Sequence, residues 1–228
     1  MDLRKFPAAC VALAAVLIAA AAPAAAQVTY KPHETNASRE ARIERTIAET
    51  YSHRWEVFGG GGYMRFRSGQ YTEKNNEITW NVQANYFLSP KLSVVGDARG
   101  MFGNGKPLRP QTQAINPQIN QYTFTGGVGY RFYAKERVAV SGQALGGVGI
   151  GNFSGASKGL SYLQTGFWQD AARPAFIVDL AVDLNVYPNL GFRILPTYVG
   201  TTFTSPSGGS LQNNLGINFG IIYRFGHQ

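Results

Sequence analysis

The feature that most constrains this chain is an almost regular alternation of apolar and polar side chains between residues 78 and 88. The segment reads I-T-W-N-V-Q-A-N-Y-F-L. Ile78, Trp80 and Val82 fall on one parity, whereas Thr79 and Asn81 fall on the other. Because successive side chains of a β-strand point to opposite faces, this segment predicts a strand with one apolar face and one polar face.

The alternation recurs along the chain and predicts eight strands. They cover residues 54–67, 78–88, 92–102, 122–133, 138–150, 175–186, 190–203 and 214–225. Glycines at 59–62 blur the first strand, and Pro196 in the seventh lacks a backbone N–H, which predicts a bulge or local break. The links alternate between short turns and longer segments rich in Gly, Asn, Gln, Ser and Pro. This pattern indicates an all-β, antiparallel, up-and-down transmembrane barrel with short periplasmic turns and long extracellular loops.

The first 26 residues have the composition of an export signal. Arg4 and Lys5 precede an uncharged stretch that ends in Ala24-Ala25-Ala26. A small-residue ending followed directly by polar sequence favours a cleaved signal peptide at 1–26 over an uncleaved membrane anchor. Cys10 is the only cysteine, so the expected mature chain has neither disulfide bonds nor thiol chemistry.

Three further segments follow the leader. We expect a periplasmic extension at 27–53, a barrel at 54–225 and a short tail at 226–228. Within the extension, residues 36–51 predict a short polar helix with Asn36 or Ser38 as its N-cap. This helix either covers the periplasmic mouth of the barrel or packs at the membrane surface, or it forms a mobile extension. Three apolar residues at helical spacing do not decide among these alternatives.

The polar faces of the strands predict a filled lumen. They carry Thr, Ser, Asn and Gln, together with charges of both signs. The interior of an eight-stranded barrel is just wide enough for side chains, and each buried charge there needs a partner. A soluble calyx would reverse the faces and carry many Lys and Glu outside, which this chain lacks. The expected lumen charge network consists of Asp97, Arg99, Arg131, Asp179, Asp183, Arg193 and Arg224.

Aromatic residues gather toward both ends of the apolar faces. Two aromatic bands separated by smaller aliphatic residues are typical of the two headgroup interfaces of a membrane. The expected interface girdles consist of Trp80, Tyr86, Tyr122, Phe124, Tyr130, Phe132, Phe176, Phe192, Tyr198, Tyr223 and Phe225.

With its leader, its eight alternating strands and the ending Ile221-Ile222-Tyr223-Arg224-Phe225, the chain resembles the small outer-membrane barrels of the OmpA transmembrane-domain and OmpX type. The resemblance covers about residues 54–225. It implies location in the bacterial outer membrane and recognition of the final strand by the outer-membrane assembly machinery. The chain departs from that ending, because Gly226, His227 and Gln228 follow the last aromatic residue.

Residues capable of catalysis are sparse. The three histidines, His33, His53 and His227, lie outside the expected membrane strands and the long loops. A Ser–His–acid set at the outer rim is therefore not expected, and no metal-ligand spacing is present. The runs at 126–129 and 146–149 lack the context of a phosphate loop and are better explained as bends in curved strands. We expect neither an enzyme nor a cofactor.

The remaining functional candidates are the charge and the loops. The formal net charge is +8 without a Lys/Arg cluster on one element, which favours contact with anionic lipid headgroups, lipopolysaccharide included, over nucleic acid. The loop 151–174 carries the aromatic residues Phe153, Tyr162, Phe167 and Trp168. They either form a contact surface for a ligand, lipopolysaccharide or another cell, or they pack the loop on itself or dip into the lipid headgroups. We expect a structural or surface-interaction protein, with a small porin-like channel as the alternative and a lipid-modifying enzyme as a third possibility.

Overall fold

The computed structural model describes residues 35–69, 72–105, 117–155, 157, 159, 161–205, 208–209 and 211–227. The expected signal peptide at 1–26 lies outside these residues. The chain divides into two compact units, Met1–Ala41 and Arg42–Gln228, and the second unit contains the barrel.

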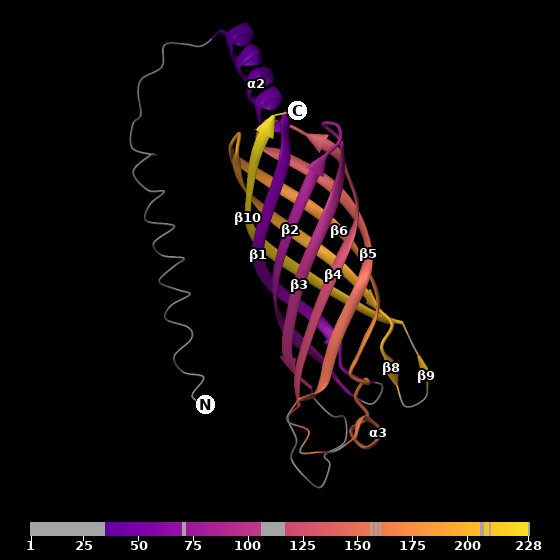
Figure 1. Ribbon diagram of the computed structural model, residues 1–228. Coiled ribbons are helices and arrows are strands. Elements are labelled where there is room, and N and C mark those ends of the chain that lie inside the picture. Colours follow the sequence, from indigo (N-terminus) through magenta and orange to yellow (C-terminus); the bar gives the residue numbers. More distant parts are fainter. Residues whose placement is uncertain are drawn as a thin grey trace. The chain divides into compact units, whose positions relative to one another are not determined.

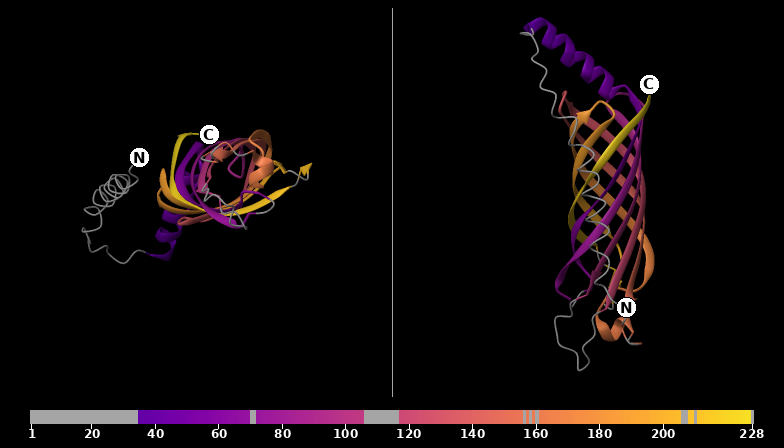
Figure 2. Two further views of the ribbon diagram at one scale, coloured as in Figure 1. Left: turned by 90° about the horizontal axis from the view of Figure 1, so that it is seen from below. Right: turned by 90° about the vertical axis from the view of Figure 1, so that its left-hand side faces the viewer.

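Within the described residues, eight strands close into one barrel (Figure 1). The strands are β1 (His53–Arg67), β2 (Lys74–Phe87), β3 (Leu92–Asn104), β4 (Gln118–Ala134), β5 (Val138–Gly155), β6 (Ala171–Tyr187), β7 (Leu190–Thr201) and β10 (Gln212–His227). Each strand pairs antiparallel with its neighbours in sequence, and β1 pairs with β10 to close the ring (Figure 2). The predicted up-and-down, eight-stranded barrel is confirmed.

Several strands are longer than predicted at the end with the long links. β2 begins at Lys74 and not at 78, and β5 continues to Gly155 and not to 150. These extra residues are mostly polar or small, so they pair in the ladder without showing the apolar alternation that predicts a strand. A small hairpin, β8 (Thr204–Ser205) with β9 (Gly208–Gly209), was also not predicted, because two residues per strand carry no period.

The predicted local break at Pro196 is present. β6 and β7 pair at Asp179↔Thr197 and again at Val182↔Ile194, but not in between. The register resumes unchanged beyond the gap. A missing backbone donor therefore interrupts the ladder without shifting it.

Glycine is required where two seams of the barrel bring backbones close together. A Cβ on Gly62 would lie 1.9 Å from the carbonyl oxygen of Ile217, and a Cβ on Gly147 would lie 2.1 Å from that of Phe124. These contacts lie at the β1–β10 and β4–β5 seams, which are opposite each other in the closed strand order. The glycine runs thus fit their interpretation as sites of strand curvature.

Two helices accompany the barrel. Helix α2 (Asn36–Tyr51) matches the predicted bounds, but its N-cap differs from both expected candidates. The hydroxyl of Thr35 accepts a hydrogen bond from the Ser38 N–H at 3.3 Å, so Thr35 caps the helix. Helix α3 (Tyr162–Thr165) is a single turn in the β5–β6 link and ends at Gly166, which has a φ of 73°. Among the described residues, no helix is long and apolar enough to cross a bilayer.

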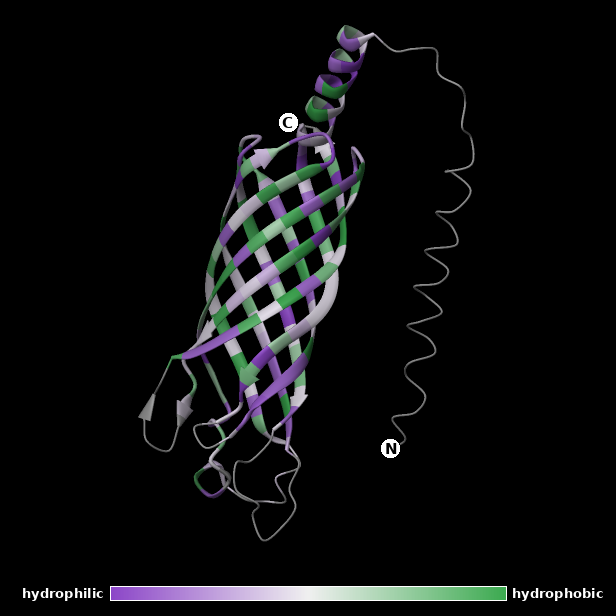
Figure 3. Ribbon diagram, turned by 180° about the vertical axis from the view of Figure 1, so that it is seen from behind, coloured by the Kyte–Doolittle hydropathy of each residue, from purple (hydrophilic) through white to green (hydrophobic). Residues whose placement is uncertain are grey.

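The outer wall of the barrel is apolar and its inner face is mixed. Alternate residues along each strand are exposed and buried, and the hydropathy changes in step with this alternation (Figure 3). The expected girdle residues all lie on the outer parity. Tyr86 packs against Trp55 with ring centroids 4.8 Å apart, and Tyr198 packs against Phe176 at 5.7 Å.

Candidate functional site

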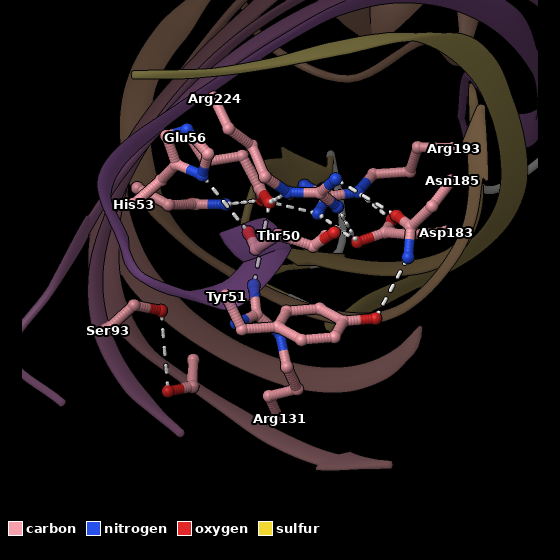
Figure 4. A network of polar contacts seen from close by, with 12 residues as sticks. Thr50, Tyr51, His53, Glu56, Ser93, Arg131, Asp183, Asn185, Arg193 and Arg224 are labelled. Atoms are coloured by element: carbon pink, nitrogen blue, oxygen red, sulfur yellow. Dashed lines mark hydrogen bonds and ion pairs between the residues drawn. The ribbon is translucent and has the colours of Figure 1, made fainter. Parts of the chain in front are cut away.

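The interior of the barrel is the most elaborate polar arrangement in the described part of the chain. At the end with the short turns, Glu56 of β1 is its centre (Figure 4). The Glu56 carboxylate accepts hydrogen bonds from Arg193 at 2.5 Å and from Arg224 at 2.8 Å. The Arg131 guanidinium lies 3.6 Å from the same carboxylate. Asn85 donates a fourth contact at 2.9 Å, so both carboxylate oxygens are satisfied.

Asp183 of β6 completes this first network. Arg193 donates to its two oxygens at 2.6 and 2.9 Å, and Arg224 lies 3.3 Å from it. The strand register explains the pairing, because Asp183 faces Arg193 across β6–β7 while Glu56 faces Arg224 across β1–β10. Three arginines against two carboxylates leave this network with a formal charge of +1. It crosses the lumen from one side of the barrel to the other.

The last residue of helix α2 covers the mouth beside this network. The Tyr51 hydroxyl donates to the Lys135 carbonyl at 2.7 Å and accepts from the Asn185 amide at 2.9 Å. The Arg131 guanidinium lies 4.7 Å from the Tyr51 ring centroid and 4.3 Å from that of Phe87. Burial raises the pKa of the Tyr51 phenol, so it remains a neutral hydrogen-bonding group. These contacts tie the C-terminal end of the helix to this end of the barrel.

A second charged network lies deeper in the lumen. Arg99 of β3 pairs with Asp97 at 2.8 Å and with Asp179 of β6, and it also donates to the Thr197 hydroxyl at 2.9 Å. The Gln83 amide donates to both carboxylates, at 2.9 Å to Asp97 and 3.1 Å to Asp179. One arginine against two carboxylates leaves this network at −1. The structure therefore places all seven predicted lumen charges inside the barrel and divides them between two groups.

Apolar side chains separate and extend these networks. Phe58, Ala181, Leu195 and Ile222 form one buried cluster. In the sequence, Ala181 falls between the inward residues Asp179 and Asp183, so this cluster lies between the two networks. A second buried cluster comprises Met64, Val95, Met101, Leu145, Ile177 and Val199. The prediction of a lumen filled by polar and charged side chains was therefore incomplete, because apolar residues fill much of it.

Sequence reasoning missed these apolar residues and two buried acids. The glycines at 59–62 hid the parity of β1, which places Glu56, Phe58 and Met64 on its inner face. The alternation of Trp55, Glu56 and Val57 was the sequence signal that could have placed Glu56 on the inner face. Glu77 of β2 is fully buried, and Gln121 donates to its carboxylate at 3.0 and 3.2 Å.

Across the described ranges, no three His, Cys, Asp or Glu residues gather as metal ligands would.

An aromatic cluster closes the barrel at the end with the long links. It consists of Phe66, Ile119, Phe153, Phe167, Trp168 and Phe203. The Trp168 indole donates to the Arg67 carbonyl at 2.6 Å, and its backbone N–H donates to the Ser68 carbonyl at 3.0 Å. The Asp170 carboxylate accepts from the backbone N–H of Phe153 at 2.6 Å. These bonds tie the β5–β6 link to the rim of the barrel.

This placement bears on the four aromatic residues that were candidates for ligand contact. Phe153, Phe167 and Trp168 are buried in the aromatic cluster together with Phe66, Ile119 and Phe203, so they pack the link against the rim of the barrel. Tyr162 is half-buried, and its neighbour Leu163 is 61% exposed. A contact surface on this loop therefore has to use residues around α3.

A closed, antiparallel, eight-stranded barrel with an apolar wall and a filled interior is the architecture of small outer-membrane barrels. A scan against protein-family models gave no match, and a search of curated proteins by sequence gave none. Solved structures are similar in fold. The attachment invasion locus protein Ail of Yersinia pestis is 19% identical, with a TM-score of 0.50 over 76% of this chain and 99% of that chain.

Two further solved structures give the same result. Neisserial surface protein A is 11% identical, with a TM-score of 0.53 over 75% of this chain and 97% of that one. The outer membrane protein OprG of Pseudomonas aeruginosa is 12% identical, with a TM-score of 0.53 over 78% of this chain and 99% of that one. The chain thus shares the fold of these small eight-stranded barrels.

Proposed function

We propose that this protein is an outer-membrane β-barrel whose filled lumen supports a structural or surface-interaction role of its long-loop end. The observation that carries the proposal is the obstruction of the lumen along its length. Two ion networks and two apolar clusters fill the interior, Tyr51 covers one mouth, and the aromatic cluster closes the other.

The dimensions of the outer wall support location in a membrane. Arg65 lies ten residues beyond Trp55 on β1, and the outward residues between them are Val57, Gly59, Gly61 and Tyr63. At about 3.3 Å per residue and a strand tilt of about 40°, this distance spans roughly 25 Å along the barrel axis. An apolar band of about that height is what a transmembrane barrel presents to lipid. The exposed rings of Tyr223 and Phe225 at the end of β10 support recognition by the assembly machinery.

A small channel is the second candidate. Along the inner faces of β4 and β5, the hydroxyls of Thr123 and Thr125 and the amide oxygen of Gln143 have no hydrogen-bond partner among the described residues. Glycines flank them on both strands, so this side of the lumen is the place where water molecules would bind. The two ion networks nevertheless cross the lumen and favour the closed barrel.

Location and orientation are tested by cysteine labelling in a Cys10→Ser background. Leu163→Cys places a thiol on the long-loop end, and Lys135→Cys places one in a short turn. In intact cells, a membrane-impermeant maleimide is expected to label Leu163→Cys and not Lys135→Cys, whereas lysed cells label both. The unboiled protein from the outer-membrane fraction is expected to migrate faster on a gel than the boiled protein. A soluble periplasmic protein without this shift would contradict the proposal.

A further inference from the structure

Three basic residues form an unusual group on the outer face of β1 and β2. Arg65, Arg67 and Lys74 are exposed and share the outward parity of these strands. Arg67 and Lys74 face each other directly across the β1–β2 ladder, and Arg65 faces Asn76. We call Arg65, Arg67 and Lys74 the cationic ladder. Facing positions in an antiparallel pair bring side chains to within about 5 Å at their Cβ atoms.

This arrangement is electrostatically unfavourable without an external partner. Like charges directly opposite each other destabilise a strand pair. Among the residues that the structure describes, no carboxylate forms an ion pair with any member of the cationic ladder, and neighbouring Glu73 forms none with Lys74. An anion bound from outside the chain would neutralise the repulsion.

The cationic ladder also has a defined height on the wall. It begins on the long-loop side of Tyr63 and Ile78, which are the last outward apolar residues of β1 and β2 and are 62% and 64% exposed. Arg65 is therefore at the edge of the apolar band that faces the long loops, where lipid headgroups would lie. Beside Arg65, a hollow of about 330 Å³ opens on the wall, lined by Tyr63, Arg65, Asn76, Leu215 and Ile217 among others. The hollow is apolar on the side of the apolar band and basic on the side of the long loops.

We propose that the cationic ladder binds the phosphate groups of a phosphorylated glycolipid of the outer leaflet, with part of an acyl chain in the hollow. This inference rests on the proposed membrane location. A soluble polyanion would match the charges but not the apolar lining from Leu215 and Ile217, which continues into the wall of the barrel. A lipid with a phosphorylated headgroup satisfies both features at once.

The experiment compares two charge-matched triple variants in phosphatidylcholine nanodiscs. The first, Arg65→Ser with Arg67→Ser and Lys74→Ser, removes the cationic ladder. The second, Lys91→Ser with Lys135→Ser and Arg137→Ser, removes three exposed basic side chains at the short turns and serves as the control. The probes are phosphorylated lipid A, the same lipid without its phosphates, and inorganic phosphate, with retention by the barrel measured by native mass spectrometry.

The wild type and the control are expected to bind phosphorylated lipid A, whereas the first variant binds it on the order of tenfold to a hundredfold more weakly. Removal of the lipid phosphates is expected to weaken binding to the wild type by a similar factor, and millimolar inorganic phosphate is expected not to compete. Equal binding by both variants, or full competition by inorganic phosphate, would overturn the lipid site. A wild-type protein that inserts and shows the gel shift but binds the phosphorylated and dephosphorylated lipids equally refutes the site alone, whereas absence of insertion refutes the proposed function.

Discussion

At the scale of single residues, Glu56 has the largest effect on the interior. Its carboxylate contacts three arginines that come from β4, β7 and β10, so one side chain joins strands around the whole ring. Each arginine is nearly or fully buried. Without Glu56, Asp183 would remain as the only carboxylate of the first network, facing Arg193 and Arg224 together.

We therefore expect Glu56→Ala to lower the free energy of unfolding by about 3–5 kcal/mol, because removal of one partner leaves buried arginines uncompensated. The measurement is urea-induced unfolding of the barrel in lipid vesicles, followed by tryptophan fluorescence. Glu44→Ala on the exposed face of α2 is the control and should change the value by less than about 0.5 kcal/mol. Similar losses in both variants would show that Glu56 does not hold the network together.

At the scale of elements, the end of α2 depends on Tyr51. Tyr51→Phe keeps the ring against Arg131 but removes the hydrogen bonds to Lys135 and Asn185. We expect a loss of about 1 kcal/mol, seen as faster hydrogen exchange of the amides at 42–51. Tyr133→Phe, which changes an exposed tyrosine on the outer wall, should leave this exchange unaltered. Unchanged exchange in Tyr51→Phe would mean that these bonds do not fix the helix.

The β5–β6 link depends in the same way on Trp168. Trp168→Ala removes the indole from the aromatic cluster together with its hydrogen bond to the Arg67 carbonyl. We expect a loss of roughly 3–5 kcal/mol in docking of the link and cleavage of this loop by protease added to intact cells. Leu163→Ala, at an exposed position on α3, is the control and should remain resistant. Equal resistance of the two variants would show that the cluster does not hold the loop.

The same elements show what the sequence could predict. Alternation depends only on neighbouring side chains, so it predicted all eight strands and the inward position of Arg99 or Asp183. Pairing between strands depends on the register of a closed ring, which no local pattern contains. Asp179 meets Arg99, 80 positions away in the sequence, for that reason. Glu56 was missed because glycines carry no side chain from which to count parity. The N-cap Thr35 lies one residue before Asn36, the nearer of the two predicted candidates.

At the scale of the whole molecule, the two ion networks form two layers of the lumen with opposite residual charges. The first network carries three arginines and two carboxylates, and the second carries one arginine and two carboxylates. Together they hold four positive and four negative groups and are separated by the cluster around Phe58. Opposite residual charges on the two layers attract across a medium of low polarity, which stabilises the packed interior. A continuous path for hydrated ions would have to displace both layers.

Single-channel recording in planar bilayers tests this closed interior most directly. The protein is first shown to be folded and inserted by the faster gel mobility of the unboiled sample. The recording is then expected to show no discrete current steps for the wild type in 1 M KCl, whereas Glu56→Ala combined with Asp183→Ala should produce brief, irregular openings as the first network loses its acids. Steady, uniform conductance steps from the inserted wild-type protein would contradict the filled lumen and establish a channel.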